Sequence, residues 1–158
     1  MRSASILCYV NIELYRKGLE SEALNQLDAS CWQPGTVMPD GTTYAGISPV
    51  NARPFFAAAA DAPRLMRWDE AMEYAKDLEL HGYRDWLVPS FEELDVIYGN
   101  KSMLALRGSF NERGTDPAGW YWSSSEFNSS FARIQRFSVG TQSLSQRSER
   151  RSARLNGQ

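Results

Sequence analysis

Apolar side chains recur at helical spacing in three stretches of this chain, which polar or turn-forming segments separate. The first stretch, Asn11–Asp28, places an apolar residue every three or four positions between charged ones. The second, Trp68–Leu80, is the clearest amphipathic pattern, and the third, Phe91–Tyr98, directs Leu94 and Ile97 to one side. This spacing predicts three helices. We expect the first to be an addition to the main domain that packs against it or serves in oligomerisation.

Start and stop signals bracket the second and third predicted helices. His81-Gly82 follows the second, and glycine suits the left-handed conformation in which many helices end. Ser90, followed three residues later by Glu93, forms a capping box at the start of the third. The intervening segment, Tyr83–Pro89, is expected to be extended up to its closing proline.

Short segments between turn-forming residues predict strands in much of the remaining chain. Cys31–Pro63 is rich in proline and glycine, and Asp40-Gly41 has the composition of a hairpin turn. Strand-like stretches occur later at Trp120–Ser123, Phe131–Ser138 and Ala153–Leu155. Two helices followed by antiparallel strands predict an α+β fold with one small sheet and long irregular loops.

Composition supports a folded domain, and charge is distributed unevenly along it. The 158 residues are 42% hydrophobic and 12% aromatic, which suffices for a core, and the net charge is −2. Residues 1–130 carry 11 basic and 18 acidic side chains, whereas residues 131–158 carry six arginines against Glu149 alone. We expect this end to pack on its own acidic domain. The alternative is a tail that binds nucleic acid or another polyanion. The six arginines are Arg133, Arg136, Arg147, Arg150, Arg151 and Arg154.

The sequence shows no stretch that could span a bilayer, and the apolar run Ile6–Val10 is too short for a secretory signal. The protein is therefore expected to be soluble, and cytoplasmic or virion-associated by default. Cys8 and Cys31 match no zinc-binding spacing and are expected to be reduced, mostly buried thiols.

Ionisable and nucleophilic residues do not converge on an active-site pattern. His81 is the only histidine and has no carboxylate partner in register. Ser123-Ser124-Ser125 lacks the glycine-flanked turn of a nucleophilic serine and is expected to satisfy backbone groups at a strand end. Phosphate-binding glycine loops and paired metal ligands are absent from the sequence. We therefore expect a non-enzymatic protein that uses no cofactor and no metal.

The segment Phe127–Ser148 has a composition typical of binding surfaces. It contains no lysine, aspartate or glutamate, while serine, asparagine, arginine and phenylalanine interleave. Aromatic and guanidinium anchors among short polar side chains favour contact with a partner. A serine-rich surface hairpin without a binding role would have a similar composition, so composition leaves both interpretations open.

Two blocks of sequence resemble a known family. The first runs from Trp68 and Ala71 through Asp85-Trp86-Leu87-Val88-Pro89-Ser90 to Glu93-Leu94, and the second is Gly119–Glu126 with the later Gln135 and Gly140-Thr141-Gln142. They are similar to the signature of a C-type-lectin-like domain of unknown function from phages and bacteria, found also at the C-terminus of bacterial collagen-like adhesins. The resemblance covers roughly residues 35–155. It implies one C-type-lectin-like domain over residues 31–158, after a helical extension over residues 1–30.

Some members of this family resemble the variable proteins of diversity-generating retroelements, whose late asparagine codons are randomised. Such codons never become lysine, glutamine, glutamate, methionine or tryptophan. Three glutamines in this segment, Gln135, Gln142 and Gln146, are of the excluded kind, and they fall where relatives keep framework residues. The candidate binding positions all hold residues that a randomised asparagine codon can encode. The resemblance thus implies a variable ligand-binding surface formed by Phe127, Asn128, Ser129, Ser130, Phe131, Arg133, Ile134, Arg136, Val139, Thr141, Ser143, Leu144, Ser145 and Arg147.

The sequence also departs from the family pattern. Leu87 replaces the usual arginine, Ser90 replaces the usual threonine, and the closing strand motif is altered at Ala153–Asn156. The wider superfamily includes formylglycine-generating enzymes, whose reactive cysteines lie late in the chain, and this chain has none after Cys31. A small lectin-like enzyme that uses His81 with a nearby carboxylate is the remaining enzymatic alternative.

These observations combine into one interpretation. The large indole rings of Trp68, Trp86, Trp120 and Trp122 are expected in the core. Outward side chains of the last strands, with the phenylalanines and arginines as anchors, are expected to contact a protein or cell-surface ligand. Nucleic-acid binding and membrane insertion are not expected, and formation of a homo-oligomer stays open.

Overall fold

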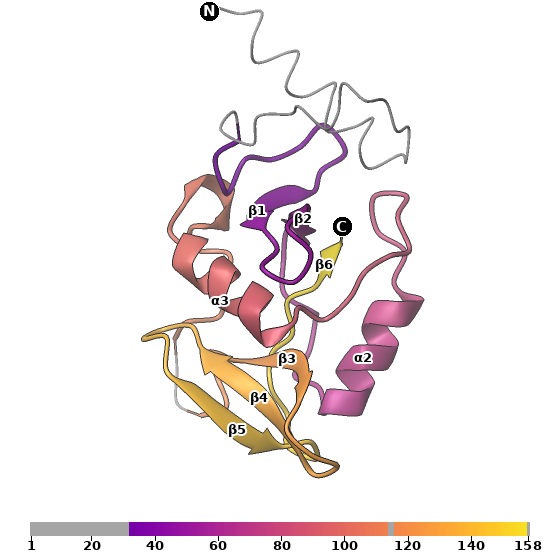
Figure 1. Ribbon diagram of the computed structural model, residues 1–158, viewed down its shortest axis with the longest axis vertical. Helices are drawn as coiled ribbons and strands as arrows, with labels where there is room; N and C mark the ends of the chain where they lie inside the picture. Colours follow the sequence, from indigo (N-terminus) through magenta and orange to yellow (C-terminus); the bar gives the residue numbers. More distant parts are fainter. Residues whose placement is uncertain (1–31, 114–115, 158) are drawn as a thin grey trace, which may run out of the picture.

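A computed structural model describes residues 32–113 and 116–157, and these form two helices and two small antiparallel sheets (Figure 1). The α+β class is confirmed, with two sheets where the sequence predicted one. The predicted helix over residues 11–28, the extension over residues 1–30 and both cysteines lie outside the described residues. The elements are β1 (Thr43–Ile47), β2 (Pro54–Ala57), α2 (Trp68–Asp77), α3 (Phe91–Asn100), the 3-10 turn η3 (Leu104–Leu106), β3 (Trp120–Glu126), β4 (Phe131–Arg136), β5 (Gln142–Gln146) and β6 (Asn156–Gly157).

The first sheet has the strand order β1-β2-β6 and joins the beginning of the domain to its end. The predicted hairpin turn at Asp40-Gly41 is confirmed, since Val37 and Thr43 pair on either side of it and Gly41 adopts a φ of +88°. The predicted strand Ala153–Leu155 is wrong, because β6 begins only at Asn156. Residues 153 and 155 are instead buried, and their carbonyls accept single hydrogen bonds from the loop that follows β2.

The second sheet is the meander β3-β4-β5, at the lower end of the molecule in Figure 1. Its first two strands were predicted, although β4 ends at Arg136, two residues earlier than expected. Strand β5 was not predicted, because the sequence Gln-Ser-Leu-Ser-Gln offers a single apolar residue and no alternation to detect. Pairing with β4, over a continuous register from Phe131–Gln146 to Gln135–Gln142, makes this segment a strand.

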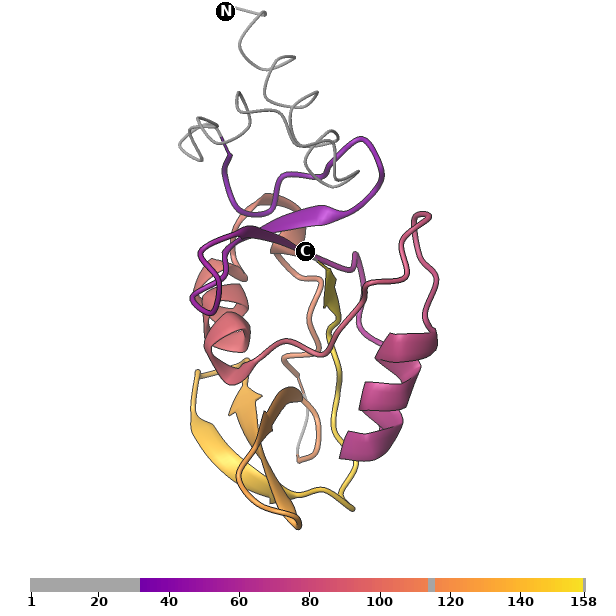
Figure 2. The ribbon, with the colours of Figure 1, turned by 45° about the vertical axis from the view of Figure 1, so that its right-hand side comes forward.

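Both predicted helices of the domain are present, on different sides of the molecule (Figures 1 and 2). Helix α3 begins with the predicted capping box, in which Ser90 accepts a hydrogen bond from the Glu93 backbone and Glu93 accepts one from the Ser90 backbone. Helix α2 ends at Asp77, three residues earlier than predicted. His81 and Gly82 do not end this helix. They form a tight hairpin turn with positive φ angles of 56° and 81°, closed by reciprocal backbone bonds between Leu80 and Tyr83.

Tryptophan side chains occupy the centre of the main hydrophobic cluster, between α2 and β3. Trp68, Trp86 and Trp122 are buried as predicted, and each indole N–H donates to a backbone carbonyl. Trp120 is only half-buried and packs against the margin of this cluster, so it belongs to the edge of the core and not to its interior. It lies at the outer end of β3, where the Arg136 guanidinium approaches its ring at 6.0 Å.

A second cluster lies between α3 and the two sheets, and it contains a buried charge. The Arg154 guanidinium is fully buried, and its Nε donates to Asp61 Oδ1 at 2.8 Å while Nη1 donates to the Ala58 carbonyl at 2.7 Å. The Tyr121 hydroxyl donates to the other Asp61 oxygen and accepts from the Asn111 backbone. Burial, and then the neighbouring Asp61 carboxylate, raise the pKa of Tyr121 above its ordinary value. This network fixes the last residues of the chain against the core.

The charge on Arg154 makes a quantitative prediction for stability. Arg154→Ala leaves the partly buried Asp61 carboxylate without its cation, so we expect a loss of about 3–5 kcal/mol in the free energy of unfolding. Arg150→Ala removes a half-exposed cation bonded to Glu70 and should cost less than about 1 kcal/mol. Urea unfolding of both variants measures the difference. Equal losses would show that burial does not set the strength of these contacts.

Candidate binding surface

The predicted site residues divide into three groups by exposure. Most of the β3–β4 loop, the β4–β5 turn and the outer side of β5 are exposed, as expected. Side chains at the sheet's margins are half-buried, and a small remainder is buried. The exposed ones are Phe127, Asn128, Ser129, Ser130, Arg133, Val139, Thr141, Ser143 and Leu144; Phe131, Arg136 and Arg147 are half-buried; Ile134 and Ser145 are buried.

Ile134 and Ser145 are corrections to the predicted surface, since they are only 3% and 5% exposed. Ile134 pairs with Trp122, and Ser145 pairs with Ala132 on the same side of the sheet. Paired residues share a face, and this face packs against the tryptophan cluster. Neither side chain is therefore available to a ligand.

The β3–β4 loop holds its own shape through Asn128. The Asn128 side-chain oxygen accepts hydrogen bonds from the backbone of Ser130 and of Phe131, both at 2.9 Å. The Phe131 carbonyl in turn accepts from the backbone of Phe127 and Asn128. This arrangement holds the loop backbone from which Phe127, 57% exposed, projects. The Asn128 side chain thus mainly stabilises the loop, whereas the Phe127 side chain is exposed to solvent.

The side of β4 and β5 that faces α3 carries a cation beside apolar groups. The Arg133 guanidinium lies over the Phe91 ring at 5.2 Å, a cation–π contact at the start of α3. Arg133 pairs across the sheet with Leu144, which is 40% exposed. Next along the same face, Gln135 and Gln142 both donate to Asp95 Oδ1, at 2.7 and 3.3 Å. These glutamines hold the sheet against α3, which agrees with their predicted framework role.

Sequence reasoning missed the contributions of α3 to this surface. Phe91 and Asp95 belong to no recognisable motif, and their partners are 42 and 40 positions away. One signal was present: Phe91 is an aromatic residue in the first turn of a helix, a position that usually favours polar or acidic side chains. An apolar ring there suggests a contact beyond the helix itself.

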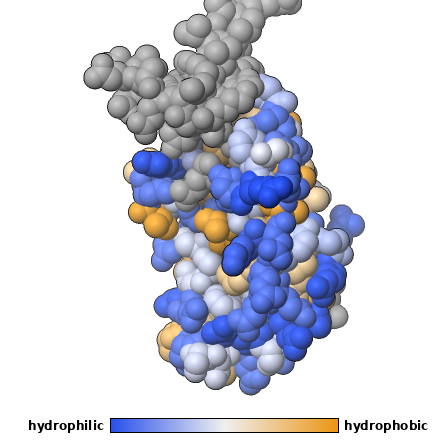
Figure 3. Space-filling model, turned by 90° about the vertical axis from the view of Figure 1, so that its right-hand side faces the viewer, coloured by the Kyte–Doolittle hydropathy of each residue, from blue (hydrophilic) through white to orange (hydrophobic). Residues whose placement is uncertain are grey.

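Arg147 connects the end of β5 to α2 and to the β3–β4 loop. Its guanidinium stacks on Trp68 at 4.0 Å, forms an ion pair with Asp69, and lies 3.5 Å from Glu126 and 3.4 Å from the Ser129 carbonyl. Beside it, Ser129 and Ser148 border a hollow of about 480 Å³ whose other wall is the first turns of α2. The molecule's surface on the α2 side is mainly hydrophilic (Figure 3).

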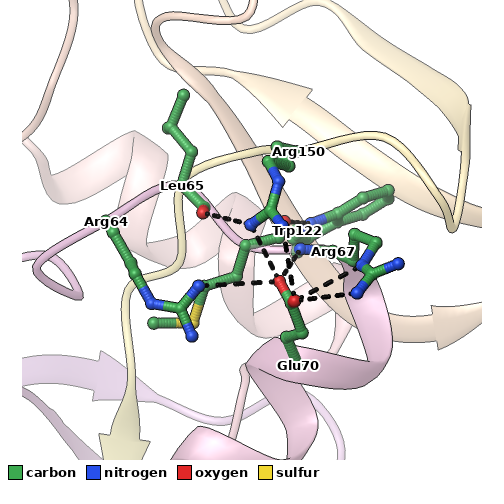
Figure 4. A network of polar contacts seen from close by, with 7 residues as sticks. Arg64, Leu65, Arg67, Glu70, Trp122 and Arg150 are labelled. Carbon is green, nitrogen blue, oxygen red and sulfur yellow. Dashed lines mark hydrogen bonds and ion pairs between the residues drawn. The ribbon is translucent and has the colours of Figure 1, made fainter.

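Glu70 is the centre of a network of arginines at the start of α2 (Figure 4). Its carboxylate accepts from the Arg67 backbone at 2.9 Å and from the side chains of Arg67 and Arg150, and Arg64 lies 3.8 Å away. The backbone hydrogen bond from Arg67 is the largest cause that lowers the pKa of Glu70 to about 2, and the nearby arginine charges add to it. Arg150 also donates to the Leu65 carbonyl, so Glu70 joins the C-terminal segment to the helix.

The arginine-rich end packs on acidic residues of the domain, as expected. Arg147, Arg150, Arg151 and Arg154 each form an ion pair with an aspartate or glutamate from residues 61–126. Arg133 and Arg136 lie over aromatic rings instead. The six cations therefore attach the last segment to the rest of the fold.

The residues weighed for catalysis have structural contacts. Ser123 Oγ donates to the Arg133 carbonyl, and Ser125 Oγ accepts from the Phe91 backbone, which confirms that these serines satisfy backbone groups. They lie within β3 and not at its end, because the strand continues to Glu126. The His81 ring lies directly against Gly41, where a Cβ atom would come within 2.6 Å of it. Among residues 32–113 and 116–157, no three histidine, cysteine or acidic side chains are grouped so as to hold a metal ion. Within the same ranges, no helix is both long and apolar enough to cross a bilayer.

Comparison with known proteins gives one match. The family model described as the Lcl C-terminal domain matches residues 26–155. This range is close to the roughly 35–155 over which the sequence resembled a lectin-like family. None of the curated proteins compared with the chain matches it.

The lowered pKa of Glu70 predicts a pH-dependent stability. Because the folded-state pKa of about 2 lies below the ordinary value of 4.5, ionised Glu70 stabilises the fold above pH 4.5, and this contribution disappears as pH falls towards 2. We expect Glu70→Gln to be less stable than the unmodified protein at pH 7 and nearly equal to it close to pH 2. Urea unfolding across this range measures the change. Glu73→Gln, an exposed change on the same helix, controls for the loss of one negative charge.

Proposed function

The chain belongs to the Lcl C-terminal domain family, and from this premise we propose that it is a non-enzymatic binding protein of the adhesin or receptor type. The ligand is a protein or a cell-surface molecule. It contacts the β3–β4 loop together with the α3-facing side of β4 and β5. The principal contacts come from Phe127 and Arg133.

One observation supports this proposal above the others: the exposed side chains stand on a backbone that other residues hold in place. Phe127 is displayed by a loop that Asn128 closes, and Arg133 and Leu144 lie on strands that Gln135 and Gln142 tie to α3. Aromatic and arginine side chains dominate the binding energy of many interfaces. A support that is already ordered lowers the entropy lost when they bind.

The absence of catalysis is part of the proposal. The hydroxyls of Ser123 and Ser125 bond to backbone groups of neighbouring segments, and His81 serves in a hairpin turn. Neither arrangement presents a nucleophile with an adjacent base, the geometry that covalent catalysis needs. Binding is the activity that these surfaces support best.

We further propose that the surface is a variable one, of the kind made by diversity-generating retroelements. The main chain of β4 and β5 pairs through backbone hydrogen bonds that do not depend on the exposed side chains. Substitution at Phe127, Val139, Thr141 or Ser143 therefore leaves the framework contacts in place. Ile134 and Ser145 are excluded from this proposal because they are buried, and Arg147 is constrained by its stacking on Trp68.

Alanine substitution tests the binding surface directly. We expect Phe127→Ala with Arg133→Ala to weaken binding by at least roughly tenfold to whichever probe the protein retains on an array of cell-surface glycans and protein ectodomains. The melting temperature should change little, because both residues are exposed. Arg84→Ala, at an exposed arginine directly after the Leu80–Tyr83 hairpin, is the control. Undiminished binding by the double variant would contradict the assignment.

The variable character has its own test at the level of the gene. A diversified surface requires a reverse transcriptase gene nearby and a near-copy of the segment that encodes residues 127–148. In that copy, adenines should stand where the exposed positions are encoded. Genome sequencing around the gene reads this out, and a locus without either element would refute diversification while leaving the binding proposal intact.

A further inference from the structure

Strand β5 is the edge of its sheet, and its outer side is open. The strand order β3-β4-β5 leaves β5 with one neighbour among the described residues. Unpaired N–H and C=O groups along such an edge are a template for another strand. Proteins usually block exposed edges with a lysine, a proline or a bulge, and Gln142–Gln146 contains none of these and pairs with β4 without a break in register.

The other sheet edges in the described parts of the chain are covered. On β1, Tyr44 exchanges backbone hydrogen bonds with Gly35 and Thr36. On β6, Asn156 exchanges them with Leu87, and on β3 the segment at Ser152 occupies the outer side beside a bulge. The open edge at β5 is therefore an exception within this fold.

The register shows which backbone groups point outward. The Arg136 N–H donates to the Thr141 carbonyl at 2.8 Å, and the Arg147 N–H donates to the Ser130 carbonyl at 2.9 Å. Hydrogen-bonded and non-hydrogen-bonded pairs alternate along an antiparallel ladder, so Ser143 and Ser145 also turn their backbones towards β4. Residues 142 and 144 consequently direct their N–H and C=O groups away from the sheet. Gln146 directs its N–H the same way, while its carbonyl accepts from the Glu149 backbone at 3.0 Å.

We propose that this edge pairs with β5 of a second copy of the chain. The strand reads Gln-Ser-Leu-Ser-Gln and is symmetric about Leu144. A two-fold axis through Leu144 places it opposite Leu144 of the second copy, and Gln142 opposite Gln146 of the second copy. Leu144 then exchanges both backbone hydrogen bonds with Leu144 of the second copy, and each Gln142 carbonyl accepts from the Gln146 N–H of the second copy, as an isologous contact requires.

Side-chain chemistry fits this self-pairing. Leu144 is 40% exposed, so a contact between two copies of it removes apolar surface from water at the centre of the interface. The strand carries no charge, so the pairing brings no like charges together within it. A shift of two residues would retain the backbone bonds but place leucine opposite glutamine, so the symmetric register is the favoured one.

The pairing goes beyond the proposed ligand-binding function and changes its geometry. Paired residues lie on the same face, so the joined sheet carries Arg133 and Phe131 of both copies on one side. Two adjacent surfaces would bind a multivalent partner with higher avidity than one. Leu144 then lies at the junction between the copies and serves the association first.

Sedimentation equilibrium of the full chain tests the association. Stable interfaces usually bury about 1,200–2,000 Å², and one short strand pair buries less, so dimers should form reversibly across roughly a hundredfold range of concentration. Leu144→Pro removes an outward N–H while sparing the ladder with β4, and we expect it to stay monomeric. Leu144→Ala retains the N–H and should associate more weakly than the unmodified chain but detectably.

Cross-linking identifies the register and remains informative if Leu144→Pro fails to fold. In a background with Cys8→Ser and Cys31→Ser, Leu144→Cys brings two sulfurs together, because facing residues of a hydrogen-bonded pair lie about 5.5 Å apart at Cα. Oxidation should join it into dimers much faster than Phe127→Cys, an exposed control away from the edge. A monomer at every concentration, no faster cross-linking at 144, or dimers that persist in a folded Leu144→Pro variant would each overturn the proposal. The proposal would also be overturned if the protein stayed monomeric and its β5 edge bound only an unrelated synthetic extended peptide.

Discussion

Two buried indole groups form a reciprocal connection on which the rest of the fold depends. Trp68, the first residue of α2, donates its N–H to the Ser123 carbonyl in β3, and Trp122 in β3 donates its N–H to the Met66 carbonyl just before α2. Both bonds are 2.8 Å long and buried, where an unpaired N–H would be costly. They fix the helix and the second sheet relative to each other, and the positions of β4 and β5 follow by pairing.

This connection explains how one segment carries both framework and surface. Within residues 127–148 the strand alternation sends Ile134 and Ser145 towards the tryptophans, while Arg133 and Leu144 face the other side. Helix α3 covers that other side only in part, at Gln135 and Gln142. The uncovered portion is the candidate binding surface, and its outer margin is the open edge of β5. Ligand binding and self-association thus use the same sheet. Ligand binding depends on exposed side chains, whereas self-association depends on the backbone groups of β5 together with the Leu144 side chain.

Charge has a different part in this architecture. The C-terminal arginines reach three separate parts of the domain: α2 through Arg147 and Arg150, the loop before β3 through Arg151, and the second core cluster through Arg154. Of these, the Arg154 contact is fully buried and satisfied by carbonyls as well as by Asp61, so it stabilises the end of the chain most strongly. The more exposed ion pairs orient the C-terminal segment on the domain and contribute little to the free energy of unfolding.

The sequence by itself determined the elements that local rules specify. The capping box at Ser90, the turn at Asp40-Gly41 and the amphipathic pattern from Trp68 each depend on residues within a few positions of one another, and each is present. The charge imbalance likewise predicted that the arginine-rich end packs on the domain. The motif blocks around Trp86 and Trp122 also pointed to a family, and the family model matches residues 26–155, which contain both blocks.

Only the tertiary structure decided which side chains of the last strands are free. Strand β5 has no alternation of its own and exists because β4 supplies hydrogen bonds, and the burial of Ile134 and Ser145 depends on which face meets the tryptophans. His81-Gly82 has the composition of a helix end, yet its backbone pairs Leu80 with Tyr83 in a hairpin. The contacts of Phe91 and Asp95 with β4 join residues some forty positions apart. Local pattern carries no information about such partners, because the contact exists only once the chain has brought both segments together.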